Sequence, residues 1–320
     1  MCIRDRFNYL GDLDYYSNTL GFPHWGRHDF CWLCDCHRQD DSKSPWDFTE
    51  KPGWKLKPYK DLKESPCTSH PLFKIPGGLP EYRICLDALH TLDLGLSARL
   101  AGSILHCWAF PPGATKSAGA CNIAKIWASI KEAYEALKIK EKFNNMTVSM
   151  FCNAEKPFAS VPILKGHAGE IRHFLFALSW VAWKKAHESE MHNHMAESLA
   201  HLCEFYSLLK EQDFFMEEEA WKKAHKAMRG CLIHVAWLNR SCKDEYRFRV
   251  TPKMHFALHL AWSCRWQNAS TCWTYKQESF MGYVSNLAHS CSHGTRACRL
   301  SSSLVSKYLL ALQLKINNLI

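Results

Sequence analysis

Apolar residues recur three and four positions apart through most of residues 81–245, and this periodicity restricts the chain to a mainly helical fold. On a helix such spacing places the apolar side chains on one stripe, which has to be buried against other helices. The 320 residues are 47% hydrophobic and include 13 Trp and 17 Phe, enough for a large core. The segments that carry the periodicity, each predicted to be a helix, are 86–105, 122–139, 169–187, 195–212 and 217–238.

Regions of different character flank this helical part. Near the start, "FNYLGDLDYYSNTLGFPHWGRHDF" (7–30) predicts the end of a strand that runs into a turn or short helix. Residues 35–80 are rich in Pro, Lys, Asp and Ser, which predicts a long irregular loop. The resulting division of the chain is 1–34, 35–80, 81–245 and 246–320.

The net charge and the distribution of cysteines indicate which kind of partner and which cellular environment to expect. The formal net charge is +9, and residues 241–320 hold ten Lys/Arg against three Asp/Glu, which favours a surface that faces a polyanion. The 16 cysteines are scattered along the chain, as expected of reduced, intracellular thiols. No secretory signal precedes the first helix, and the longest apolar run, "FLFALSWVAW" (174–183), is about half a membrane span. We therefore expect an intracellular protein that is neither secreted nor embedded in a membrane.

Two pairs of metal-binding residues stand far apart in the sequence. Cys31 and Cys34 form a Cys-x-x-Cys pair, and His255 and His259 are one turn apart on an expected helix. Together they supply the four soft or borderline ligands of a tetrahedral zinc site, which would join the two ends of a large fold. With 18 His and 16 Cys in the chain, coincidental spacing is the alternative. A further His pair in "MHNHM" (191–195) is interpreted as a solvated helix face.

Two carboxylates are candidates for holding a hard cation such as Mg²⁺. Asp12 follows a glycine where a strand is expected to end, and its ordinary alternative is a turn residue. Glu278 is the one carboxylate side chain in residues 246–320 and lies in a basic segment, where a salt bridge is the alternative.

The quoted residues occur in a recognisable order: "GDLDYYSNTLGFPHWGRHDFCWLC", "DALHTLDLGL", "PKMHFALHL" and "WTYKQESFMGYVSNLAH". This order resembles that of DDE/D transposases with an inserted helical domain, of the CACTA (En/Spm) and Kyakuja-Dileera-Zisupton type, with the RAG recombinase as a distant relative. The resemblance implies a partial RNase H-like fold, with its first strands missing, and a large helical insertion domain. It also implies roles for single residues: Asp12 and Glu278 as the second and last catalytic acids that bind Mg²⁺ or Mn²⁺, and Cys31, Cys34, His255 and His259 as ligands of a structural Zn²⁺.

Other motif positions have a smaller part in the resemblance. Asp87 and His90 match the segment that opens the helical insertion and are secondary candidates for the neighbourhood of the active site, and Asp93 and Cys36 rank below them. Eleven residues precede Asp12, too few for the strand that carries the first acid, so we expect the C-terminal portion of a transposase, inactive as given.

The function that the resemblance implies is DNA processing in the nucleus, by two-metal phosphodiester cleavage and strand transfer in an intact parent protein. DNA is the implied partner, and a homo-oligomer is left open. The alternative is a zinc-stabilised helical module that binds DNA or protein without catalysis.

Overall fold

A computed structural model of the chain describes residues 9–57, 84–242, 247–292 and 297–316. The chain forms two compact units, and the boundary between them lies between Trp273 and Thr274. The first unit therefore includes both the N-terminal segment and residues 247–273, which the sequence analysis had assigned to different regions. The second unit is described by itself below.

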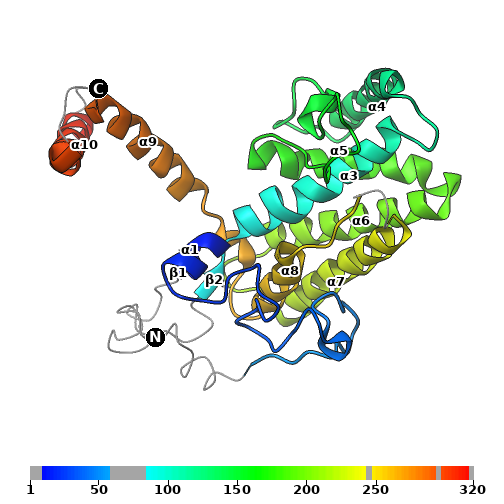
Figure 1. Cartoon of the computed structure of the whole chain (residues 1–320), viewed down its shortest axis with the longest axis horizontal. Helices are drawn as coiled ribbons and strands as arrows, with labels where there is room; N and C mark the ends of the chain where they lie inside the picture. The colour runs from blue at the N-terminus through cyan, green and yellow to red at the C-terminus, as the bar shows by residue number, and fades with distance from the viewer. Residues whose placement is uncertain (1–8, 58–83, 243–246, 293–296, 317–320) are drawn as a thin grey trace. The chain divides into compact units, whose positions relative to one another are not determined.

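The described chain is mainly helical, as the periodicity predicted (Figure 1). Each of the five predicted segments corresponds to helix, although the first is π-helical over Leu89–Ser97 before it continues as an α-helix. The α-helices of the first unit are α1 (Leu13–Asn18), α3 (Ala98–Ala109), α4 (Lys116–Ala136), α5 (Ala168–Lys185), α6 (Glu190–Glu211), α7 (Glu218–Ser241) and α8 (Pro252–Ser263).

Local sequence signals fix where these helices begin. At the start of α5 the His167 amide donates to the Glu170 carboxylate at 3.0 Å, one half of a capping box. Ser189 caps α6 by accepting from the His192 amide at 3.2 Å. Helix α8 begins with Pro252, whose missing N–H costs nothing in the first turn.

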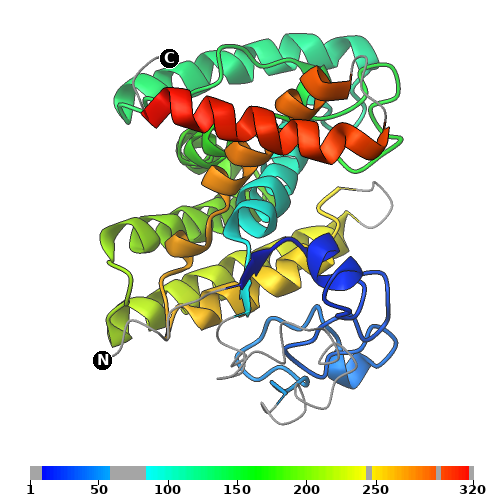
Figure 2. The same cartoon turned by 90° about the vertical axis from the view of Figure 1, so that its left-hand side faces the viewer.

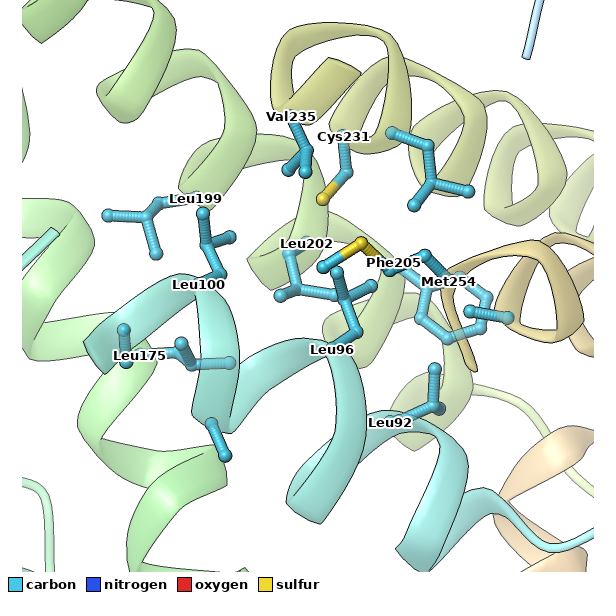
Figure 3. Close-up of a cluster of buried hydrophobic side chains, with 14 of the residues drawn as sticks. Leu92, Leu96, Leu100, Leu175, Leu199, Leu202, Phe205, Cys231, Val235 and Met254 are labelled. Carbon is cyan, nitrogen blue, oxygen red and sulfur yellow. The ribbon is translucent and has the colours of Figure 1, made fainter. Parts of the chain in front are cut away.

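The core of the first unit lies where the π-helical segment Leu89–Ser97 meets helices α3, α5, α6, α7 and α8. Figure 3 shows apolar side chains from these elements pointing toward one another. Burying such side chains is the main stabilising contribution to a helical fold of this size. The side chains labelled in that view are Leu92, Leu96, Leu100, Leu175, Leu199, Leu202, Phe205, Cys231, Val235 and Met254.

Two short strands pair in parallel beside this core. Strand β1 (Tyr9–Gly11) lies next to β2 (Ile84–Leu86), with Gly11 opposite Leu86 at their carboxyl ends. The Tyr16 hydroxyl, on α1, donates to the Cys85 carbonyl and so ties the short helix after β1 to β2. The sequence analysis predicted a strand end followed by a short helix at this point, and β1 and α1 have that form.

The irregular segment after α1 folds against α8. Residues 30–57, named here the cysteine loop, contain one short 3₁₀ turn (Asp41–Lys43), and Phe48 and Trp54 in it are buried. Figures 1 and 2 both show this segment beside α7 and α8. The remainder of the predicted loop, residues 58–80, lies outside the described residues.

The second unit contains α9 (Tyr275–Ser292) and α10 (Leu300–Ile316), which pack on each other. The rings of Phe280 and Tyr308 lie 5.8 Å apart, and Lys307 Nζ donates to the Ser290 carbonyl at 3.0 Å. Across both units, none of the helices in the described ranges is both long and apolar enough to cross a lipid bilayer.

Candidate metal centre and adjoining cleft

The cysteine loop presents three thiols on one side because its two limbs pair with each other. Cys34 and Leu56 form an antiparallel bridge, flanked by hydrogen bonds from the Asp35 amide to the Lys55 carbonyl and from the Lys57 amide to the Leu33 carbonyl, both 3.0 Å. The loop therefore has a defined shape although it contains almost no regular secondary structure.

Helix α8 supplies the imidazoles. His255 and His259 are one turn apart, so they share the face of α8 that packs on the cysteine loop. Their side chains are buried, with exposed fractions of 0% and 2%. A buried imidazole pair needs polar partners, and here the partners are thiols.

Thiols and imidazoles converge at one buried point. The sulfur of Cys34 lies 3.3 Å from His255 Nε2, that of Cys36 lies 3.6 Å from the same nitrogen, and that of Cys31 lies 3.4 Å from His259 Nε2. In a tetrahedral zinc site with bonds of about 2.0–2.3 Å, neighbouring ligand atoms are about 3.3–3.8 Å apart. The observed spacing therefore suits a metal ion such as zinc.

Five donors compete for four positions in this cluster. The ligand atoms of Cys31, Cys34, Cys36 and His255 lie within 4.8 Å of one another. His259 stands beside this set, with its Nε2 3.0 Å from the Nε2 of His255. The four residues predicted from spacing are thus together, and Cys36, ranked low from sequence, lies among them. The overlooked signal was the Cys-x-x-Cys-x-Cys spacing, which continues the pair by one more alternate position.

The orientation of His255 is fixed from outside the cluster. Its Nδ1 donates to the Pro45 carbonyl at 2.9 Å, which leaves Nε2 directed at the thiols of Cys34 and Cys36. Histidines that bind metals are typically held in this way, by a carbonyl or carboxylate on the second nitrogen. Trp54 covers the centre, with ring centroids 5.2 Å from His255 and 5.3 Å from His259.

The two imidazoles of the cluster have pKa values shifted in opposite directions. Burial opposes protonation of His255, but the neighbouring thiols of Cys31 and Cys36 outweigh it and raise its pKa to about 10. Burial and the charge of His255 hold the pKa of His259 well below its usual range. A divalent cation would replace the proton on His255 and satisfy the thiolates directly, as metal binding at Cys/His sites generally does.

A cleft of about 680 Å³ adjoins the metal centre at the ends of the two strands. Asp12 directly follows β1 and Asp87 directly follows β2, and the parallel register brings both to the same edge. Ligand sites are common at the carboxyl ends of parallel strands. The charged and imidazole side chains that line the cleft are Asp12, Asp14, Asp87, His90, Arg38, Arg99, Arg249 and Lys253.

Asp12 and Asp87, the carboxylates at the strand ends, each accept a hydrogen bond from a nearby backbone amide. Asp12 Oδ1 accepts from the Tyr15 amide at 2.7 Å and caps α1, so the turn role considered for this residue is present. Asp87 is almost fully buried, accepts from the Leu89 amide at 2.8 Å, and pairs through its other oxygen with His90 Nδ1. The Asp87 carboxylate therefore orients the His90 imidazole, which is one-quarter exposed at 26%.

Cations of the cleft lie close to one another. Burial lowers the pKa of Arg99, and the positive charge of Arg249 lowers it further. Burial also lowers the pKa of Lys253, with a further contribution from Arg99, while three acids of the cleft oppose this effect. Arg38 comes from the cysteine loop and is held by donation from Nη2 to the Trp25 carbonyl at 2.7 Å. Like charges gathered in this way attract an anion.

Two sequence candidates lie elsewhere. Asp93, on the π-helical segment, is fully buried and accepts from the Tyr206 hydroxyl at 2.6 Å and the Trp273 indole at 2.9 Å, so it binds helix α6 to the end of the first unit. Glu278 belongs to α9 in the second unit, and its side chain lies outside the described residues. The expected approach of Glu278 to Asp12 therefore stays a prediction.

No protein-family model, no curated protein and no solved structure matches this chain. The function has to be inferred from the site itself.

Proposed function

We propose that the chain is part of a DNA-processing protein of the DDE/D transposase type, with a partial RNase H-like sheet formed by β1 and β2. The observation that carries this proposal is the position of Asp12 and Asp87. Each directly follows one of two paired parallel strands, so both lie at one edge of a cleft that is also lined by cations. Acids and bases in one cleft suit a ligand that combines phosphate groups with divalent cations.

The metal centre has a structural role in this proposal. Its donors are buried and supply at least the four protein ligands of a closed site, leaving no position for a substrate. The bound zinc would hold the cysteine loop against α8. Since Arg38 belongs to that loop and Lys253 to α8, the metal would fix the distance between two cations of the cleft.

The cleft would bind the DNA backbone and a cation. Arg38, Arg99 and Arg249 would contact phosphates, and Asp12 would offer oxygen to Mg²⁺ or Mn²⁺. The resemblance assigns the last acid to Glu278. In the parent reaction these ions activate water and stabilise the leaving 3′ oxygen. The pairing of Asp87 with His90 would hold an imidazole at the edge of the same cleft.

DNA binding by the cleft can be tested by fluorescence anisotropy with a labelled duplex at several salt concentrations. Each lost phosphate contact reduces the salt slope by about 0.9, so we expect the Arg99→Gln/Arg249→Gln double variant to bind more weakly, with a slope shallower by about 2. Arg240→Gln, which removes an exposed cation at the end of α7, is the matched control and should bind like the wild type. Equal weakening in both variants would count against the cleft.

A zinc-stabilised module that binds DNA or protein without catalysis is the second candidate. It is favoured by the local hydrogen bonds of Asp12 and Asp87, which explain both acids without a reaction. Binding of Mn²⁺, measured by electron paramagnetic resonance, distinguishes the two candidate functions. A bound Mn²⁺ that Asp12→Asn releases supports the transposase type, whereas DNA binding without bound Mn²⁺ supports the module.

Cleavage itself is not expected from this chain. The DDE/D reaction uses three acids, and the resemblance assigns two of them, Asp12 and Glu278. We therefore expect no nicking of supercoiled plasmid with Mg²⁺ or Mn²⁺. Nicking that Glu278→Gln abolishes would contradict this expectation.

A further inference from the structure

A second group of metal-ligand side chains lies between α6 and α7, away from the cysteine loop. Glu197 and His201 are one turn apart on α6, and His234 faces them from α7. One ligand atom from each of these three residues lies within 4.8 Å of the others, and all three side chains are half-buried. The sequence analysis interpreted the neighbouring residues 191–195 as a solvated helix face and did not single out these three residues.

A fourth imidazole adjoins the three. His194 precedes Glu197 by nearly one turn of α6, and its Nδ1 lies 2.8 Å from His234 Nδ1. The His194 ring stacks on Trp237 with centroids 3.8 Å apart and planes only 6° from parallel. Packing therefore holds this imidazole against α7. His194, Glu197, His201 and His234 are named here the histidine cluster.

The ring of His201 packs against Gly230 on α7, in space that a residue with a Cβ atom would fill. A Cβ atom at Gly230 on α7 would lie 2.7 Å from both Cδ2 and Nε2 of His201, well inside van der Waals contact. The Nε2 edge of the ring therefore packs on α7, the helix that carries His234. At its other edge, Nδ1 lies 3.5 Å from a Glu204 carboxylate oxygen, the type of partner that commonly orients a metal-binding imidazole.

The geometry points to a second metal site: we propose that His201, His234 and Glu197 bind a borderline divalent transition-metal ion such as Zn²⁺, with His194 as a neighbouring donor. Two imidazoles and one carboxylate form a set that zinc accepts, and such a set leaves a coordination position for water. Imidazole and carboxylate are harder ligands than thiolate, so this site would differ chemically from the cysteine-rich centre. The proposal is independent of DNA processing.

Metal binding here would join α6 to α7. The two helices are connected by residues 212–217 and pack along their lengths, and an ion coordinated from both adds a contact near the middle of the pair. Because the ligands are half-buried and one coordination position is open, we expect the ion to exchange faster than the ion at the buried thiols.

Equilibrium dialysis of the full chain against Zn²⁺, with the bound metal measured by atomic emission, tests the proposal. The wild type is expected to bind about two equivalents, one at each centre. His201→Ala and His234→Ala should each reduce this to about one and raise the Kd of the weaker site at least about tenfold. His187→Ala, which removes an exposed imidazole just before α6, is the control and should still bind two.

Absorption spectra of the Co²⁺-loaded protein distinguish the loss of this site from the loss of the cysteine centre and from misfolding. The thiolate-to-Co²⁺ charge-transfer band should persist in His234→Ala, while the additional Co²⁺ bound by the wild type should be lost. Gly230→Ala is a second variant that keeps every ligand and should weaken the site by displacing the His201 ring. A wild type that binds one equivalent, or variants that all keep two, would overturn the proposal.

Discussion

The sulfur of Cys36 lies 3.6 Å from His255 Nε2, which makes a third thiol available to a centre expected to contain two. A zinc ion with four ligands cannot use all five donors of this cluster. Cys31, Cys34, Cys36 and His255 form the mutually closest set, whereas His259 contacts only Cys31 and His255 within that set. Cys36 is therefore placed to be the fourth ligand, with His259 beside the shell.

X-ray absorption spectroscopy of the zinc-loaded protein tests this assignment. We expect three sulfur and one nitrogen ligand at the cysteine centre, because the thiols of the loop are already mutually close. Cys36→Ser should convert the shell to two sulfurs and two nitrogens, with His259 taking the free position. A histidine cluster variant such as His234→Ala should be used for both measurements, so that the second site does not contribute nitrogen.

A wild-type shell of two sulfurs and two nitrogens would contradict this assignment. It would show that His259 is the fourth ligand and that Cys36 is a buried thiol beside the centre. His259→Gln would then lose zinc affinity more strongly than Cys36→Ser.

Among the elements, the π-helical segment Leu89–Ser97 links the cleft to the core. The segment begins two residues after Asp87, carries His90 at the cleft and places Asp93 against α6. Segments of π-helix are rare and are frequent at functional sites. A Cβ atom at Gly95 would lie 2.7 Å from the His90 carbonyl of the same segment and 3.1 Å from Lys253 Cδ on α8.

Gly95→Ala should therefore affect both stability and the cleft. The added methyl group meets backbone on one side and the stem of a cleft lysine on the other, so we expect a loss of about 1–3 kcal/mol in the free energy of unfolding. Urea denaturation followed by circular dichroism measures this loss, and DNA anisotropy should show weaker binding as Lys253 moves. At Gly282, on α9, an added Cβ atom meets nothing within 4 Å, so Gly282→Ala is the control. Equal stability of Gly95→Ala and wild type would show that α8 shifts to accommodate the methyl group.

For the first unit as a whole, the metal centre acts as a clasp between distant parts of the chain. Cys34 and His255 are 221 positions apart, and their contact closes the chain around helices α3 to α7. Because the ligands come together only in the folded unit, zinc binds the folded protein, and its binding free energy adds to the stability. The zinc ion should thus contribute to the stability of the whole unit.

Removing the metal should accordingly destabilise the protein globally. We expect Cys34→Ser, or a strong chelator, to release the tightly held zinc and lower the free energy of unfolding by about 4 kcal/mol, the contribution of a ligand present at roughly 1,000 times its Kd. Thermal denaturation with zinc quantified in parallel measures both effects. Cys121→Ser changes an exposed thiol on α4 and should alter neither. Release of zinc without a change in stability would show that α8 and the cysteine loop hold together by packing alone.

Sequence alone determined the mainly helical class and the approximate course of the five helices, because periodicity of three and four is a property of neighbouring residues. It also indicated the Cys31, Cys34, His255 and His259 pairs, since one turn of helix and one knuckle are local spacings. The strand at β1 and the short helix after it followed from a few adjacent residues in the same way.

Which distant residues meet depends on how the folded elements pack. The parallel pairing of β1 with β2 brings Asp12 and Asp87 to one edge although 75 positions separate them in the numbering. Cys36 continues the local Cys-x-x-Cys spacing, but its contact with His255 depends on how the loop, paired at Cys34 and Leu56, packs on α8. His201 meets His234 where Gly230 leaves room for an imidazole. None of these contacts has a periodic signal, since each depends on how separate elements pack and on whether that packing offsets the entropic cost of closing the chain between them.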